Sequence, residues 1–170
     1  MSTRTTSIRR AREGDIGSLS RVYDEAWREA YRGIIPGVAL ERMIAGRGWP
    51  WWRSALHRGR PVAVVETGDT VVGYASYGRA RSRALGTDGE IDELYLLPEY
   101  QGVGLGRRLF RAVRNDLVDY GLGRLGVWSL EDNLRAGAFY ESLGGRRGPV
   151  VPDRIAGVAL SKVGYLFGKS

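Results

Sequence analysis

The sequence contains no cysteine and only one histidine, His57. The lack of cysteine excludes disulfide bonds, zinc sites with thiolate ligands and thiol nucleophiles. A Ser-His-Asp triad would have to use His57, and a metal site with several histidines cannot form. We therefore expect no bound metal. His57 lies between basic neighbours, Arg58 and Arg60, and we expect it at the surface.

Long apolar runs are also missing. No stretch is apolar for long enough to span a bilayer, and the opening stretch MSTRTTSIRRAREGD lacks the apolar core of a secretory signal. We therefore expect a cytoplasmic protein without a membrane partner. The chain has 170 residues, 43% of them apolar and 26% charged, which is typical of a soluble globular protein. Its length predicts one domain over residues 1–170.

Lysine is scarce, because Lys162 and Lys169 are the only two, so arginine supplies nearly all of the basic charge behind the net +7. Arginine favours bidentate contacts to phosphate, and a basic surface could serve nucleic acid, an anionic membrane or a phosphorylated small molecule. The arginines are spread along the chain with acidic residues between them, which favours a solvated surface as the main cause of the charge. Since no arginine-rich arm or recognition helix is present, we expect no nucleic-acid partner.

The hydrophobic pattern alternates between helical and strand periodicity along the chain. Asp15 is a plausible N-cap for the first helix. Helices are predicted over 14–33, 36–46, 48–59, 104–121 and 132–144. Strands are predicted over 7–11, 61–80 (a hairpin), 90–98 and 124–131, and the order ends in two strands, the last over 157–167. Helices separate some strands but not others, which predicts an α/β fold with a mixed, mostly antiparallel central sheet of about seven strands flanked by helices.

The stretch PEYQGVGLGRRLF places Gly102, Gly104 and Gly106 between a predicted strand and a predicted helix. Free amides and the positive dipole end at a helix N-terminus form an anion site, and glycines let such amides converge around phosphate oxygens. Arg107 and Arg108 oppose the helix dipole at this end, and a bound anion would relieve that conflict. The Walker and dinucleotide-binding patterns are both absent. The alternative is a glycine-rich turn that only joins a strand to a helix.

Two motifs together resemble those of the GCN5-related N-acetyltransferases (GNAT). Gln101 to Gly106, in the form Q-x-x-G-x-G, resembles the acetyl-CoA motif of this family, and EDNLRAGAFYESLGG is similar to its N-x-x-A-x-x-F-Y-x-x-x-G segment. The resemblance covers nearly the whole chain, since IRRAREGD and AWREAYRGIIP are similar to the N-terminal strand and acceptor-side helices of the family. It implies direct transfer of an acetyl group from acetyl-CoA to an amine, without metal or covalent enzyme intermediate.

The resemblance also implies a binding site for acetyl-CoA. The amides of the glycine turn would hold the diphosphate, the strand before the turn would pair its backbone with the pantetheine arm at a splayed sheet edge, and Asn133 would contact that arm. Asn133 could equally be a plain helix N-cap, and both roles are compatible. The implied cofactor-binding residues are Leu94, Leu96, Gln101, Gly102, Val103, Gly104, Leu105, Gly106, Arg107 and Asn133.

Tyr140 is the candidate general acid implied by the resemblance, because a phenol beside the sulfur can protonate the departing CoA thiolate. A base must also remove the proton of the acceptor, since an amine with a pKa of about 10.4 is mostly protonated at neutral pH. GEIDELYL offers carboxylates for this step, and the base is placed on Glu90 or Asp92. Strand alternation places these two on one face and Glu93 on the other, unless a bulge changes the register. The alternative is that these acids only attract a cationic acceptor or face solvent.

The N-terminal helices are rich in aromatic residues, and in the family this region walls the acceptor site. Trp27, Tyr31 and Glu93 are the expected substrate-binding residues, since aromatic rings and carboxylates attract a cationic amine. Crowding in the Trp49-Pro50-Trp51-Trp52 stretch predicts that not all three of these tryptophans are buried. The resemblance implies that the acceptor is the primary amine of a small molecule or peptide. Two further interpretations stay open, a homodimer and a non-catalytic CoA-binding regulatory module on the same fold.

Overall fold

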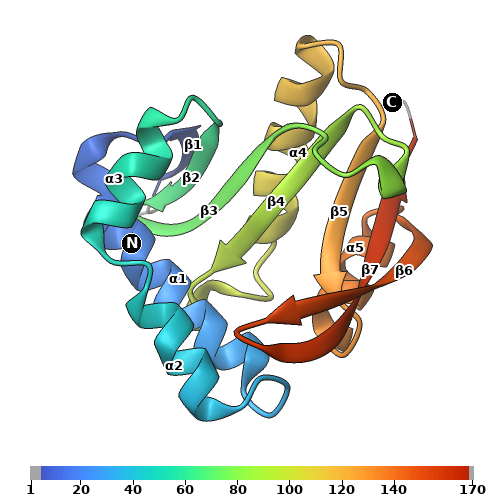
Figure 1. Ribbon diagram of the computed structural model, residues 1–170. Coiled ribbons are helices and arrows are strands. Elements are labelled where there is room, and N and C mark those ends of the chain that lie inside the picture. Colours follow the sequence, from blue (N-terminus) through green and yellow to red (C-terminus); the bar gives the residue numbers. More distant parts are fainter. Residues whose placement is uncertain (1–4, 169–170) are drawn as a thin grey trace.

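A computed structural model describes residues 5–168, and its centre is one seven-stranded sheet in the order β1-β2-β3-β4-β5-β7-β6 (Figure 1). All neighbouring strands pair antiparallel except β4 and β5, which pair parallel. The mixed, mostly antiparallel sheet predicted from the sequence is thus confirmed. The strands are β1 (Thr6–Arg10), β2 (Val62–Thr67), β3 (Thr70–Arg79), β4 (Gly89–Leu96), β5 (Leu125–Leu130), β6 (Arg146–Ile155) and β7 (Val158–Phe167).

Helices cover both faces of the sheet. The figure shows three of them beside β1 to β4 on the near face and the other two behind the sheet (Figure 1). The near helices are α1 (Ile16–Tyr31), α2 (Gly37–Ala45) and α3 (Trp49–His57), and the far ones are α4 (Leu105–Asp119) and α5 (Leu134–Ser142). Short 3-10 turns are η1 (Glu13–Asp15), η2 (Arg83–Leu85) and η3 (Pro98–Tyr100).

The apolar face of each long helix explains how it packs. On α1, the apolar positions recur every three or four residues and are buried: Ile16, Leu19, Val22, Tyr23, Ala26, Trp27 and Tyr31. On α4 the corresponding stripe is Leu105, Leu109, Phe110, Val113 and Leu117. Both stripes join one hydrophobic core that includes the central strands, so the sheet is held between the two helices.

Two local features differ from the sequence-based expectations. Asp15 does not cap α1 with its side chain; its carboxylate is instead bonded to the Arg9 guanidinium at 2.8 and 2.9 Å and to the Arg12 amide at 2.9 Å. Because Arg9 occupies the Asp15 carboxylate, this side chain does not act as the N-cap of α1. Strand β6 has no range predicted from the sequence, because Pro149 and Pro152 interrupt its β pattern. The strand still forms because it lies at the edge of the sheet, where proline is tolerated.

The sheet opens at its parallel pair, which positions the site. β4 and β5 are paired only through Gly89, Glu90 and Ile91 on one side and Leu125, Gly126 and Val127 on the other. Beyond Ile91 the paired register between the two strands ends, although both strands continue. The backbone groups along the rest of β4 that face β5 are therefore left for another partner, as the sequence resemblance implied.

Candidate active site

The glycine turn begins α4 and is shaped by backbone conformation. Gly102 and Gly104 have φ values of +76° and +86°, in the left-handed region that side chains disfavour. Gly106 is favoured for a different reason, because a Cβ there would lie 3.2 Å from the Phe139 ring and 3.4 Å from Leu96, so these side chains would have to shift. Conformation thus favours glycine at the first two positions, and close approach of α4 to α5 and β4 favours it at the third.

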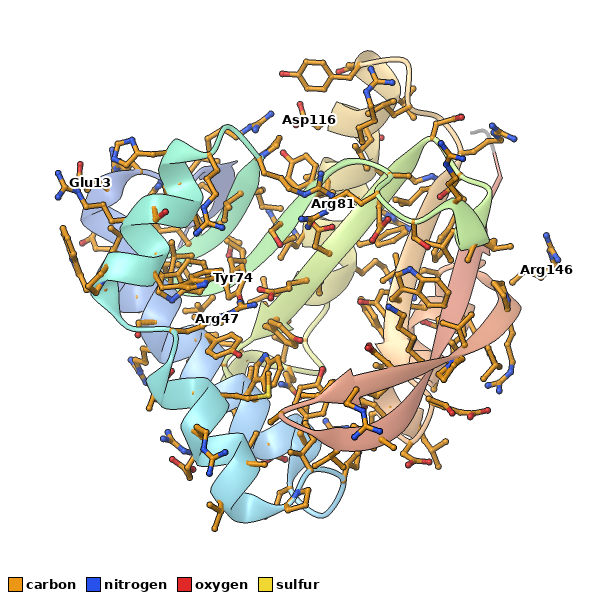
Figure 2. The ribbon with its side chains drawn as sticks, viewed as in Figure 1. Glu13, Arg47, Tyr74, Arg81, Asp116 and Arg146 are labelled. Carbon is orange, nitrogen blue, oxygen red and sulfur yellow. The ribbon has the colours of Figure 1, made fainter. Side chains whose placement is uncertain are left out.

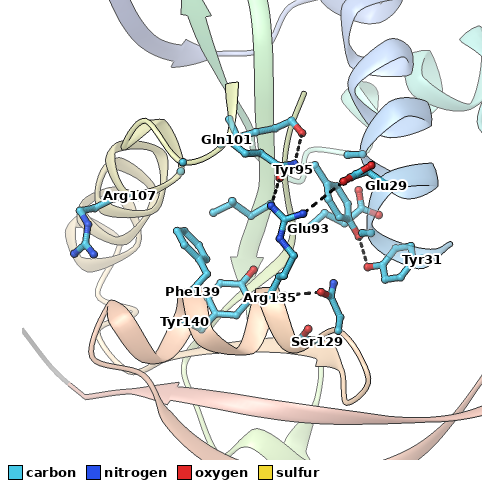
Figure 3. A pocket seen from close by; sticks show the side chains of 18 of the residues that line it. Glu29, Tyr31, Glu93, Tyr95, Gln101, Arg107, Ser129, Arg135, Phe139 and Tyr140 are labelled. Atoms are coloured by element: carbon cyan, nitrogen blue, oxygen red, sulfur yellow. Dashed lines mark hydrogen bonds and ion pairs between the residues drawn. The ribbon is translucent and has the colours of Figure 1, made fainter. Parts of the chain in front are cut away.

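A pocket of about 440 Å³ lies at the opening between β4 and β5 and extends to this turn. The first amides of α4 have no partner within the helix, so they can bind an anion that reaches the turn. Figure 3 shows the pocket with side chains from α1, β4, the turn and α5 around it. Its lining is Ala26, Glu29, Ala30, Tyr31, Asp92, Glu93, Leu94, Tyr95, Leu96, Gln101, Gly102, Gly104, Gly106, Arg107, Trp128, Ser129, Asn133, Arg135, Ala136, Phe139 and Tyr140.

Most of the residues expected at the acetyl-CoA site meet in this pocket. Those that line it are Leu94, Leu96, Gln101, Gly102, Gly104, Gly106, Arg107 and Asn133. Val103 and Leu105 do not: the Val103 side chain is 69% exposed to solvent and the Leu105 side chain is buried in the core. These two could contribute only their backbone amides to an anion site. Asn133 caps α5 with its side chain, whose Oδ1 accepts a bond from the Ala136 amide at 3.2 Å, and it also lines the pocket.

Tyr140 lies on the buried face of α5, where its ring contacts Phe139 and Tyr165, with centroids 5.2 and 5.6 Å apart. It is nearly inaccessible to solvent and lines the pocket. Burial raises the pKa of the Tyr140 phenol above its ordinary value, because desolvation disfavours the phenolate. The hydroxyl therefore stays protonated at neutral pH, which is the form that a general acid needs.

The carboxylates of β4 are placed differently from a strict alternation. The register between β3 and β4 shifts between Ser76 and Tyr77, which pair with Glu93 and Ile91, so Asp92 is left as the extra residue of a bulge. Asp92 and Glu93 both line the pocket, and the alternation is interrupted by a bulge, the exception for which the sequence-based expectation allowed. Glu90 is buried away from the pocket lining, where its carboxylate accepts bonds from the amides of Arg81 and Ser82 at 3.1 and 3.3 Å.

Arginines hold both pocket carboxylates. Arg47 donates to the two oxygens of Glu93 at 2.9 and 2.6 Å, and the Tyr74 hydroxyl donates to one of them at 2.7 Å. Arg60 makes a two-pronged contact with Asp92 through Nε and one terminal nitrogen, and Arg81 reaches the same carboxylate at 3.1 Å. Figure 2 shows Arg47 and Tyr74 close together beside α3, and Arg81 in front of β4.

The aromatic residues expected on the acceptor side divide into a core set and a pocket set. Tyr31 lines the pocket, and its hydroxyl lies 3.1 Å from that of Tyr95. Burial raises the pKa of both phenols. Trp27 is packed in the core between Tyr23 and Tyr31 and does not line the pocket, because its position on α1 faces the sheet.

The tryptophan stretch at the start of α3 is only partly buried, as the sequence predicted. Trp52 is fully buried against Tyr74, while Trp49 is 49% exposed. Trp51 packs on the Arg47 guanidinium, whose central carbon is 4.0 Å from its ring centroid, with Tyr23 at 4.3 Å as a second ring contact. His57 is exposed, as expected.

Several pocket residues had no motif to identify them. Arg135 donates to the Gln101 side chain at 3.1 Å and lies 3.5 Å from the Glu29 carboxylate, so it joins α5, the glycine turn and α1 at the pocket (Figure 3). In the sequence, only the position of Arg135 in the first turn of α5, two residues after Asn133, could have indicated it as a pocket residue. Trp128 and Ser129 line the pocket because they follow Val127, the last residue of β5 that pairs with β4. The point where two strands separate cannot be located from strand propensity.

Two classes of site receive no support from the described part of the chain. Residues 5–168 contain no group of three or more histidine, cysteine, aspartate or glutamate side chains that could hold a metal ion. Within the same residues, no helix combines the length and apolar character that a membrane crossing requires.

Comparison with known proteins supports the same interpretation. The model of the acetyltransferase (GNAT) family matches residues 19–145. The chain is 35% identical over 158 residues to an uncharacterized N-acetyltransferase of Bacillus subtilis, YuaI. The matched region covers 93% of this chain and 90% of that protein. It is 27% identical over 143 residues to the thialysine N-epsilon-acetyltransferase of Sus scrofa, with 82% and 83% of the two chains covered.

The fold is similar to that of solved acetyltransferases. The PaiA N-acetyltransferase of Thermoplasma acidophilum, solved in complex with coenzyme A, superposes with a TM-score of 0.76 over 98% of this chain and 99% of the other, at 18% identity. At that identity the likeness concerns the fold alone. It agrees with the mixed sheet and flanking helices described above.

Proposed function

The chain belongs to the acetyltransferase (GNAT) family, and we propose that it moves the acetyl group of acetyl-CoA directly to a primary amine of a small molecule or peptide. The observation that carries this proposal is the pocket itself. It brings together the glycine turn at the start of α4, the unpaired edge of β4 and the buried phenol of Tyr140.

The described residues fit acetyl-CoA along the length of the pocket. When bound, this co-substrate supplies an activated acetyl group as a thioester. Amides at the start of α4, between residues 102 and 107, would hold its diphosphate, and Arg107 adds a cation that no described ion pair occupies. The free backbone of β4 around Leu94 and Leu96 would pair with the amides of the pantetheine arm. No metal ligand set is needed for this chemistry.

Tyr140 is the proposed general acid. As the amine attacks the thioester carbonyl carbon and the carbon–sulfur bond breaks, the hydroxyl of Tyr140 gives its proton to the sulfur, so that CoA leaves as a thiol. Burial beside Phe139 and Tyr165 keeps this hydroxyl protonated.

Asp92 is the proposed base, acting directly or through water on the proton of the acceptor amine. It lines the pocket, whereas Glu90 does not. An arginine contacts both oxygens of Asp92 and of Glu93, but the second partner of Glu93 is the buried Tyr74 hydroxyl, whereas that of Asp92 is the exposed Arg81. One of the two arginines on Asp92, Arg81, is largely exposed and can move away. This first proton leaves through Asp92 to solvent. The attacking nitrogen loses a second proton as the neutral amide forms, and a proton taken up from solvent restores the Tyr140 hydroxyl.

The test is release of CoA thiol from acetyl-CoA in the presence of a panel of primary amines, with formation of the acetylated product followed by mass spectrometry. Turnover of at least one amine supports the proposal. Tight binding of acetyl-CoA without turnover of any amine would instead establish the non-catalytic CoA-binding module.

A further inference from the structure

The acceptor side of the pocket holds no free carboxylate among the described residues. Asp92 and Glu93 are the two acids of β4 that line the pocket, and their side chains are only 12% and 15% exposed. Each is contacted on both oxygens by one arginine, Arg60 and Arg47 respectively. An acceptor that brought only positive charge would therefore find its expected anionic partners already neutralised.

Arg81 is a surplus cation at this place. Its side chain is 64% exposed, and its one described ion pair is with the Asp92 oxygen that Arg60 already contacts at 2.6 Å. Three guanidinium groups thus face two pocket carboxylates. The third acid of the pocket lining, Glu29, is paired with Arg135 at 3.5 Å.

Glu90 holds the backbone of Arg81 in place. The buried Glu90 carboxylate accepts the backbone amides of Arg81 and Ser82, which ties this segment to β4 two residues before Asp92. Arg81 is therefore anchored at its backbone, and its exposed guanidinium lies outside the pocket lining and reaches it through the Asp92 carboxylate. A planar guanidinium fork of this kind matches the geometry of a carboxylate.

We propose that the acceptor is an amine that carries a carboxylate a few bonds away, as an amino acid does, and that Arg81 binds this carboxylate. The inference rests on the proposed acetyl transfer and names its acceptor class. The acceptor carboxylate would draw Arg81 away from Asp92, and the acceptor ammonium would take its place beside the Asp92 oxygen, which keeps its bond to Arg60. One ion pair of the protein is thereby exchanged for two pairs with the acceptor, which leaves the amine beside its base.

Matched acceptors provide the first experiment. Rates of acetylation are compared for a set of L-amino acids and for the corresponding carboxamides, which keep the amine and lose the charge of the carboxylate. Because hydrogen bonds to charged groups are stronger than neutral ones, kcat/KM should be about 10- to 100-fold higher for the acids at equal concentrations of free amine. O-phosphoethanolamine and ethanolamine form a second pair that reveals whether a phosphate serves as well as a carboxylate.

The second experiment is the variant Arg81→Gln, with Arg83→Gln as the matched control. Both arginines are exposed and outside the pocket lining, but Arg81 pairs with Asp92 of that lining, whereas Arg83 forms no described ion pair. For Arg81→Gln, the ratio of kcat/KM between acid and carboxamide should fall to about one, while Arg83→Gln should keep the wild-type ratio. A wild-type preference for the acid that persists in Arg81→Gln would overturn the role of Arg81.

The outcomes separate this inference from the proposed function. Acetylation of carboxamides or of uncharged alkylamines as fast as of amino acids would overturn the acceptor class and leave acetyl transfer intact. A preference for O-phosphoethanolamine over every amino acid would replace the carboxylate by a phosphate. No turnover of any amine, with acetyl-CoA bound, would overturn the acetyl transfer and the acceptor class together.

Discussion

The two ends of the pocket are built by different means. At the α4 end, backbone conformation makes the site: positive φ at Gly102 and Gly104, close packing at Gly106, and amides at a helix start. At the acceptor end, side chains make the site, through arginine–carboxylate pairs that join residues 32 and 46 positions apart in the sequence. A backbone-built site permits few substitutions and has a motif, whereas a side-chain-built site can change its specificity while the fold remains.

The largest effect should come from a change to the backbone-built end. Gly104→Val places a β-branched residue at φ +86° and displaces the first amides of α4. At a hundredfold excess over Kd, acetyl-CoA should stabilise the wild type by about 2.7 kcal/mol, a rise in Tm of about 5–10 °C. We expect the variant to show no rise and no turnover, as measured by thermal melting and thiol release.

Gly157→Val is the control for this variant. Gly157 has a similar φ of +80° and lies in the β6–β7 turn, outside the pocket lining. Its substitution should cost comparable stability and keep the full shift with acetyl-CoA. A Gly104→Val protein that still bound acetyl-CoA with wild-type affinity would show that the turn is not the anion site.

Tyr140→Phe tests the proposed acid with little effect on packing. Removal of the hydroxyl keeps the ring that packs against Phe139 and Tyr165, so Tm and acetyl-CoA affinity should change little. The value of kcat should fall by about 10²- to 10⁴-fold, the usual contribution of a general acid. Since burial raises the pKa of Tyr140, the wild-type rate should show no decline from its ionisation up to about pH 10.

Tyr165→Phe is the matched control, because Tyr165 contacts Tyr140 but does not line the pocket. Its kcat should stay close to that of the wild type. Undiminished turnover by Tyr140→Phe at every pH would exclude this phenol from the mechanism, and water would then be the remaining proton donor.

Asp92→Asn should have a smaller effect, and one that depends on pH. Near pH 7 most acceptor amine is protonated, so loss of the base should lower kcat/KM by up to about 10²-fold. As pH rises toward the amine pKa, the neutral amine becomes abundant without a base, and the deficit should shrink. The measurement is kcat/KM from pH 6.5 to 10 for one identified acceptor.

Glu90→Gln is the comparison variant, since a glutamine oxygen can still accept the amides of Arg81 and Ser82. It should remain within about threefold of the wild type across this pH range. A pH-dependent loss in Glu90→Gln combined with wild-type behaviour in Asp92→Asn would move the base to Glu90.

Sequence patterns predicted the glycine-turn end of the pocket better than the acceptor end. The order of helices and strands, the glycine turn and the Asn133 cap follow from local periodicity and backbone preference, which are encoded in neighbouring residues. The bulge at Asp92 depends on the register between β3 and β4, which alternation along one strand does not contain. The Arg47–Glu93 and Arg60–Asp92 pairs form only when the segments that follow α2 and α3 pack against β4, and therefore no spacing rule could have identified them.

Substitution of Asn133 should give the smallest effect. Its side chain combines a structural and a binding position, because it caps α5 and lines the pocket. Asn133→Ala removes the bond to the Ala136 amide and should lower the free energy of unfolding by about 1 kcal/mol. Asn133→Ser restores a cap of similar strength but has no amide group to contact the pantetheine arm. If Asn133 also binds acetyl-CoA, the serine variant should recover wild-type stability in denaturant titrations and retain a KM for acetyl-CoA raised by a few-fold. Recovery of both stability and KM in Asn133→Ser would limit this residue to its capping role.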